Sequence, residues 1–180
     1  MVTFPWFAPL LYSLLVLSIV WFISVVGPIL FGAPWLPMPV SSARRMLQLA
    51  AVRPGETVYD LGSGDGRVLI VAAREFGARA VGVEIEPIRA LIARLTLRLF
   101  GVHHAARIVR SNFFEVDLRS ADVVTLYLLS NTNARLVPKL RRELKPGARI
   151  VTLAFPMPGW EPAIRDGNIC VYRQRPSQTG

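Results

Sequence analysis

The chain has 180 residues, enough for about one domain and a short appendage. Its formal net charge is +9, and no charged side chain occurs before Arg44, so the charge belongs to the part that follows. A basic domain suits nucleic acid, anionic headgroups or acidic proteins, and charge alone does not choose among them. The single cysteine, Cys170, excludes an internal disulfide. The adjacent His103 and His104 would point in different directions on a helix, so no metal site is predicted.

The first predicted element is an apolar helix over residues 7–30. Its roughly 24 residues would reach about 36 Å at 1.5 Å per residue, enough for a hydrocarbon core of about 30 Å. We therefore expect a single-pass transmembrane anchor, with the basic domain on the cytoplasmic side. A cleaved signal peptide would need a basic segment first, which residues 1–6 lack. A hydrophobic hairpin or a buried helix is the remaining alternative.

Beyond the apolar segment, short β-rich runs alternate with helical stretches. The expected strands are residues 57–61, 80–84, 106–110, 122–129, 148–155 and 168–173. The expected helices are residues 43–51, 67–76, 87–100 and 133–144, and Pro138 is expected to break or restart the last of them. This order predicts an α/β fold, a Rossmann-like parallel sheet with helices on both faces.

The predicted organisation has three parts. Residues 1–36 form the transmembrane anchor, residues 37–175 the folded domain, and residues 176–180 a frayed tail. The region after Trp160 is short, so we expect a shortened C-terminal part of the sheet that leaves one side of the domain open.

A glycine-rich loop follows the first strand of the domain. Its sequence, Asp-Leu-Gly-Ser-Gly-Asp-Gly at residues 60–66, lies between a predicted strand and a predicted helix. Glycine lets the backbone turn sharply and approach a ligand closely, and open α/β sheets bind ligands at the carboxyl ends of their strands. The spacing G-x-G-x-G differs from the G-x-G-x-x-G that seats a dinucleotide pyrophosphate.

Two acidic residues accompany this loop. Asp60 precedes the glycines, and Glu84 ends the next strand, where its carboxylate is placed to accept hydrogen bonds from both ribose hydroxyls. Carboxylates suit a cationic sulfonium and an ammonium better than a pyrophosphate. We therefore predict S-adenosylmethionine as the cofactor, with NAD or a purely structural turn as alternatives. The loop contacts are assigned to Asp60, Gly62, Ser63, Gly64 and Gly66.

Four residues at the ends of later strands complete the predicted site. Asn112 is placed to bond the adenine edge, and Ile85 or Phe113 to cover the ring, with ordinary core packing as the alternative for Phe113. Tyr127 ends the fourth strand and is the candidate catalytic residue, because its ring or hydroxyl can orient an amine for in-line attack. A half-buried strand tyrosine is the alternative for Tyr127.

With these residues in view, the chain resembles a family of membrane-anchored protein-lysine methyltransferases. These are the enzymes of the mitochondrial ATP synthase c-subunit and adenine nucleotide translocase type and their prokaryotic relatives. The resemblance runs from about residue 27 to residue 169. It rests on the loop with its Gly-Asp-Gly-Arg continuation, on Glu84-x-x-Pro87, on residues 140–147, and on Phe-Pro-Met-Pro-Gly-Trp at residues 155–160.

The resemblance implies a class I methyltransferase fold and a protein lysine as methyl acceptor, including lysines of membrane proteins. It also implies that the segment before Ser42 folds over the cofactor. The cofactor residues that it implies are Asp60, Gly62, Gly64, Glu84 and Asn112. Prokaryotic members often carry His-Asp where Leu153 and Ala154 stand, beside the expected acceptor channel.

The leading hypothesis is an enzyme that methylates lysine ε-amines of proteins at the lipid bilayer. One alternative is methylation of a lipid headgroup or a quinone, and another is a non-catalytic module that binds S-adenosylmethionine. No nucleic-acid partner is expected, because a tethered domain without an Asn-Pro-Pro-Tyr-like sequence does not fit the nucleic-acid enzymes.

Overall fold

The computed structural model describes residues 7–30 and 37–174, with side chains for 7–22 and 37–174. The chain divides into two units, Met1–Leu36 and Pro37–Gly180, and each is described by itself. The predicted frayed tail, residues 176–180, lies outside the described residues, and so do residues 31–36 of the segment that was predicted to fold over the cofactor.

The first unit contains the helix α1, Phe7–Leu30. Its described side chains are uncharged and exposed, and the hydroxyls of Ser13 and Ser18 donate back to the carbonyls of Pro9 and Leu15, both at 2.8 Å. Within the described ranges, no helix combines the length and the apolar content that crossing a bilayer requires. The prediction of a single-pass membrane protein with a transmembrane anchor and a cytoplasmic domain is therefore wrong.

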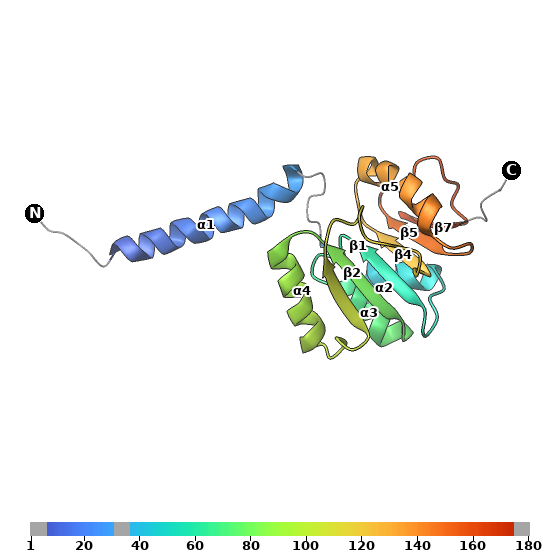
Figure 1. The fold of residues 1–180 in the computed structure, drawn as a ribbon, viewed down its shortest axis with the longest axis horizontal. Helices are drawn as coiled ribbons and strands as arrows, with labels where there is room; N and C mark the ends of the chain where they lie inside the picture. The colour runs from blue at the N-terminus through green and yellow to red at the C-terminus, as the bar shows by residue number, and fades with distance from the viewer. Residues whose placement is uncertain (1–6, 31–36, 175–180) are drawn as a thin grey trace, which may run out of the picture. The chain divides into compact units, whose positions relative to one another are not determined.

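The second unit is built on one seven-stranded sheet with the order β3-β2-β1-β4-β5-β7-β6 (Figure 1). The strands are β1 (Thr57–Leu61), β2 (Arg79–Glu84), β3 (Ala106–Arg110), β4 (Val123–Leu126), β5 (Arg149–Leu153), β6 (Ile164–Asp166) and β7 (Ile169–Arg173). The first five run parallel, whereas β7 is antiparallel to both of its neighbours. The strand order reverses direction between β1 and β4, which is where open α/β sheets bind their ligands.

Four helices cover this sheet: α2 (Val40–Leu49), α3 (Arg67–Phe76), α4 (Pro87–Leu99) and α5 (Ser130–Glu143). The first three share one hydrophobic core, to which α2 gives Met46, α3 gives Leu69 and α4 gives Leu97. Because parallel crossovers are right-handed, the reversal of strand order places α5 on the opposite face. There its Leu136 and Leu140 are completely buried.

Four predictions about the sheet and the C-terminal half are corrected. The sheet is mixed, and the expected shortening is wrong, because the short segment after Trp160 still forms the β6–β7 hairpin. Pro138 does not break α5. Proline has no N–H, so the carbonyl of Ala134 lacks its helical hydrogen bond. Pro138 and Ala134 are both exposed, so water can bond this carbonyl instead. Finally, β5 ends before residue 154, since Ala154 has a φ of +65°.

Candidate active site

The glycine-rich loop folds tightly over the end of β2. Gly62, Gly64 and Gly66 have φ values of +85°, +52° and +82°, a backbone region that other residues rarely adopt. The N–H groups of Gly62 and Ser63 both donate to the carbonyl of Val83, at 2.9 and 3.0 Å. The loop is therefore held at the carboxyl end of the sheet before any ligand binds.

Gly82 allows this close approach, and the sequence analysis missed it. A Cβ at position 82 would lie 2.6 Å from the Ser63 hydroxyl oxygen and 2.8 Å from the Ile108 side chain. The signal was available, since a glycine inside a strand often marks a close approach of two backbones.

Glu84 is brought directly to the loop, as predicted. Its side chain is buried, and its two carboxylate oxygens accept from the backbone N–H groups of Gly64 and Glu86, each at 3.0 Å. The backbone carbonyl of Glu84 accepts from the N–H of Ser111 at 3.2 Å, which ties the end of β3 to the same place. A carboxylate oxygen has two lone pairs, so each keeps one acceptor position for a ligand hydroxyl.

Asp60 is the second buried carboxyl of the site. Thr125 donates its hydroxyl to Asp60 at 2.7 Å from the neighbouring strand β4. Burial raises the pKa of Asp60 to about 7, the Thr125 hydrogen bond opposes the rise, and the charges of Asp65 and Glu84 add to it. In the described part of the chain, neither Asp60 nor Glu84 forms an ion pair with arginine or lysine. Two uncompensated acidic groups beside a glycine loop favour a cationic ligand with hydroxyl groups.

The Ser63 hydroxyl lies between the glycine-rich loop and β2. It is buried, and it has no hydrogen-bond partner among the described residues. It packs against Gly82 of β2 and does not face a ligand. The fit to S-adenosylmethionine rests on the acidic groups Asp60 and Glu84, because its sulfonium and ammonium are cationic and its ribose carries two hydroxyls.

Asp65 and Arg67 connect the loop to the segment before α2. Arg67 donates from Nε to Asp65 at 2.9 Å and from Nη1 to the carbonyl of Met38. Its hydrogen bond and ion pair with Asp65 raise the pKa of Arg67 despite some burial. Residues 37–39 are thus fastened next to the glycine loop.

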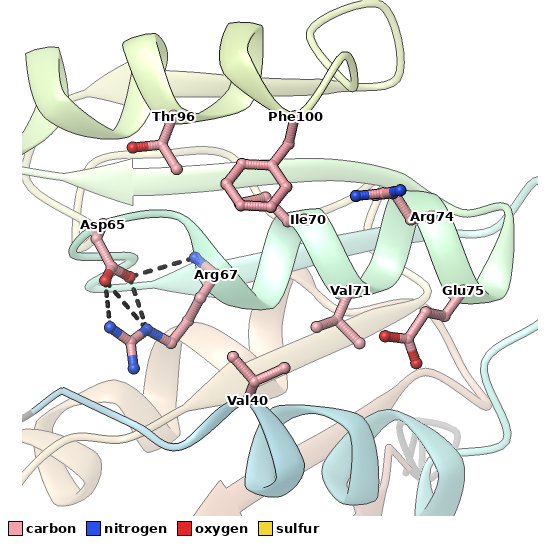
Figure 2. A pocket seen from close by; sticks show the side chains of 9 residues that line it. All are labelled: Val40, Asp65, Arg67, Ile70, Val71, Arg74, Glu75, Thr96 and Phe100. Carbon is pink, nitrogen blue, oxygen red and sulfur yellow. Dashed lines mark hydrogen bonds and ion pairs between the residues drawn. The ribbon is translucent and has the colours of Figure 1, made fainter.

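A groove of about 590 Å³ lies along α3, behind this loop. Figure 2 shows Thr96 of α4 and Phe100, which directly follows α4, bordering it on one side and Val40 on the other. Neither Asp60 nor Glu84 lines it. The groove is therefore separate from the carboxyl ends of β1 and β2, where the predicted cofactor residues meet.

The three residues predicted around adenine lie at this edge of the sheet with different surroundings. Ile85 is exposed directly after β2. Asn112 is half-buried, and its side-chain Oδ1 accepts from the N–H of Phe114 at 3.1 Å, which closes a local turn. Phe113 is half-buried with its ring centre 4.8 Å from that of Phe114.

Tyr127 follows β4, one residue past the pairing of Leu61 with Leu126. It therefore stands level with the glycine loop. Its ring is half-buried, and the ring centre lies 6.4 Å from that of Phe155. The two aromatic rings come from the ends of neighbouring strands and form one wall beside the loop.

Asn133 of α5 supports this wall and was not predicted. Its side chain is fully buried and donates from Nδ2 to the carbonyl of Phe155 at 2.8 Å. Its Oδ1 is buried and has no partner among the described residues. The sequence did contain a signal for this residue. Asn133 precedes Leu136 by three positions and Leu140 by seven, a spacing that places a polar side chain on the buried face of the helix.

Comparison with known proteins identifies the family. The ANTKMT methyltransferase domain matches residues 60–164, which include the loop, Glu84, Asn112 and Tyr127. The chain belongs to this family. This ANTKMT-type domain is an S-adenosylmethionine-dependent methyltransferase, and the predictions of enzyme class and cofactor are confirmed. The predicted family is confirmed without its membrane anchoring. The alternative of a non-catalytic module is wrong.

Individual relatives of this methyltransferase act on lysine, according to their names. A protein-lysine N-methyltransferase of Saccharolobus islandicus is 48% identical over 141 residues, covering 76% of this chain and 88% of the relative. The ATP synthase c-subunit lysine N-methyltransferase of Xenopus laevis is 34% identical over 129 residues, covering 72% of this chain. The chain spans only 56% of that animal protein.

A solved structure shares the fold at high sequence identity. It is an RNA methyltransferase from Salinibacter ruber in complex with S-adenosyl-L-homocysteine, with a TM-score of 0.72 and 42% identity. The match covers 77% of this chain and 92% of that one. The predicted Rossmann-like class I fold is thereby confirmed for the second unit.

Proposed function

We propose that this methyltransferase transfers a methyl group to the ε-amine of a lysine in a protein substrate. The observation that carries the proposal is the 48% identity to a protein-lysine N-methyltransferase, of which the chain covers 88%. The lysine methyltransferases named for the ATP synthase c-subunit and for adenine nucleotide translocase support the same acceptor at 34% and 35% identity. We assign the activity to residues 37–175.

We assign the cofactor contacts to the edge of the sheet described above. Glu84 would accept hydrogen bonds from the ribose hydroxyls through its free lone pairs, and Asp60 would face the cationic end of the cofactor. Gly62, Ser63, Gly64 and Gly66 would hold the loop against it. Ile85 and Phe113 would cover the adenine ring, and Asn112 would bond its edge.

When bound, S-adenosylmethionine supplies a methyl group already activated by the sulfonium. The acceptor lysine must be neutral to attack, so its site has to disfavour the ammonium form. The wall of Tyr127 and Phe155 is aromatic, and Leu128 beside it is buried. An apolar surrounding of this kind lowers the pKa of a lysine, and the Tyr127 hydroxyl orients the lysine amine toward the methyl carbon.

One observation favours a second candidate function, methylation of RNA. The Salinibacter ruber relative, 42% identical, is described as an RNA methyltransferase. The formal net charge of +9 is compatible with binding a polyanion. The alternative of a lipid headgroup or a quinone rested on the transmembrane anchor and has lost that support.

The test is to incubate the purified chain with S-adenosylmethionine labelled in its methyl group and with cell fractions containing protein, RNA or lipid. The proposal predicts protease-sensitive label in discrete protein bands. RNase-sensitive label would establish the second candidate instead. A Tyr127→Phe variant should lose turnover while keeping its affinity for S-adenosylhomocysteine. Turnover equal to that of the parent chain would show that Tyr127 contributes only to packing.

A further inference from the structure

Exposed apolar side chains of the second unit are concentrated in one place. Between residues 37 and 174, nine large hydrophobic side chains are exposed, and seven of them lie between Ile85 and Phe100. Single exposed apolar residues are ordinary on protein surfaces, whereas a contiguous group marks a surface that another molecule covers.

Five of these residues form a continuous stripe on the outer face of α4, which we call the α4 stripe. It consists of Ile88, Leu91, Ile92, Leu95 and Leu99, which are between 43% and 83% exposed. Their spacing places them on one side of the helix. The opposite side, with Ala90, Ala93 and Leu97, is buried in the core. The helix is therefore apolar on two opposite faces, and the sheet accounts for only one of them.

The charges of α4 are all of one sign. The helix contains Arg89, Arg94 and Arg98 and no acidic residue. At 100° per residue, Arg89 borders the α4 stripe on one side and Arg98 borders it on the other. A second copy of this chain would bring arginine against arginine across the stripe. A partner whose apolar surface is bordered by carboxylates would be complementary.

The helix is firmly connected to the active site. It begins three residues after Glu84 ends β2, and the Glu86 carboxylate caps it by accepting from the N–H of Arg89 at 2.7 Å. A Cβ at Gly66, in the glycine-rich loop, would lie 3.5 Å from the Cβ of Ala93 on the buried face of α4. A protein that covers the stripe would therefore lie next to the proposed cofactor site.

We propose that the α4 stripe is a docking surface for the protein substrate, and that it binds an apolar helical segment bordered by acidic side chains. This inference rests on the proposed protein acceptor. Docking outside the reaction site would raise the effective concentration of the acceptor lysine at the wall of Tyr127 and Phe155. The recognition would then depend on the apolar segment and its carboxylates more than on residues next to the lysine.

Three synthetic peptides test this inference with the full chain. The first has a leucine stripe bordered by glutamates and a flexible tail with one lysine. The second replaces the glutamates by glutamines and arginines, and the third is the tail alone. Affinity is measured by fluorescence anisotropy, and methyl transfer is measured separately. The chain should bind the glutamate peptide about tenfold more tightly than the second peptide, a difference of about 1.4 kcal/mol.

A Leu91→Ser/Leu95→Ser variant should lose this preference. Both side chains are more than half exposed, so the fold should be kept, and thermal unfolding and affinity for S-adenosylhomocysteine check this. The matched control is Ile164→Ser, which changes an exposed apolar residue on β6 and should leave the preference intact.

Equal affinity for the two helical peptides, or an unchanged preference in the double variant, would overturn the inference. If the parent chain self-associates and the double variant does not, the stripe would be assigned to a second copy of the chain instead. Stripe-dependent binding of phosphatidylglycerol vesicles without the peptide preference would assign it to a lipid surface. Stripe-dependent peptide binding without any methyl transfer would support the docking surface and contradict the lysine acceptor.

Discussion

The backbone N–H of Gly64 donates to the carboxylate of Glu84 at 3.0 Å, across the gap between the glycine-rich loop and the end of β2. The bond joins the two parts of the sequence signal, the loop and the acidic residue that follows it about twenty positions later. It also orients the carboxylate before the cofactor arrives. The ordering of this side chain therefore adds no entropic cost at binding.

Replacement of Glu84 by alanine should weaken cofactor binding by about 2 kcal/mol, or roughly thirtyfold in Kd, because the ribose hydroxyls lose a charged acceptor. Calorimetry with S-adenosylhomocysteine measures the change. The matched control is Glu86→Ala, which removes the cap of α4 and should reduce stability while leaving the affinity nearly unchanged. Unchanged affinity in Glu84→Ala would exclude Glu84 from the site.

The pKa of Asp60 predicts a particular pH dependence of stability. Its folded-state pKa, raised by burial to about 7, lies above the ordinary value of 3.8. The folded state therefore holds a proton that the unfolded state releases, and stability falls as pH rises from about 4 to 7. The contribution is on the order of 4 kcal/mol.

Urea unfolding of the ligand-free protein at several pH values measures this effect. In an Asp60→Asn variant the decline between pH 4 and 7 should be smaller than in the parent chain, since the amide does not titrate. Parallel pH profiles for the two proteins would show that Asp60 ionises normally.

Gly82→Ala should disturb the loop although it lies inside a strand. The new methyl group would meet the Ser63 hydroxyl oxygen at 2.6 Å, so the loop must shift, at a cost of about 1 to 3 kcal/mol. A loss of affinity for S-adenosylhomocysteine should accompany the loss of stability. In a Ser63→Gly background the same change should cost less, because two of the three close contacts disappear. Additive effects would contradict this explanation.

Asn133→Leu should loosen the turn that follows β5. The variant keeps the branched shape of the side chain, with a somewhat larger volume, and removes the hydrogen bond to the Phe155 carbonyl, worth about 1 kcal/mol. Because Phe155 and Tyr127 form one wall, we expect kcat to fall while affinity for S-adenosylhomocysteine stays the same. An equal loss of kcat and of affinity would indicate a general disturbance of the fold. An unchanged kcat would show that the turn after β5 does not influence the acceptor site.

The parts of the fold with strong local signals were predictable from the sequence. The strand at 57–61 and the helix at 67–76 were predicted with the bounds that the structure shows, because glycines end the neighbouring elements. The loop and Glu84 were brought together as the parallel strand order requires. The spacing of loop and acid thus predicted the cofactor without knowledge of the fold.

Other features depend on tertiary contacts that no local pattern records. The role of Gly82 becomes visible only when Ser63 is placed over it, and that of Asn133 only when Phe155 is placed beside α5. The continuity of α5 through Pro138 depends on solvent at Ala134. The prediction of a transmembrane anchor was wrong because it rested on an apolar run alone.

The most direct test of the proposed acceptor is amino-acid analysis of the labelled protein product. Substrate protein methylated by the purified chain is hydrolysed completely, and the labelled amino acids are separated and identified by mass. The account predicts that the label is recovered as ε-N-methylated lysine and that the Glu84→Ala variant yields much less of it at limiting cofactor. Label recovered in another methylated amino acid, or only in nucleosides from an RNA digest, would contradict it.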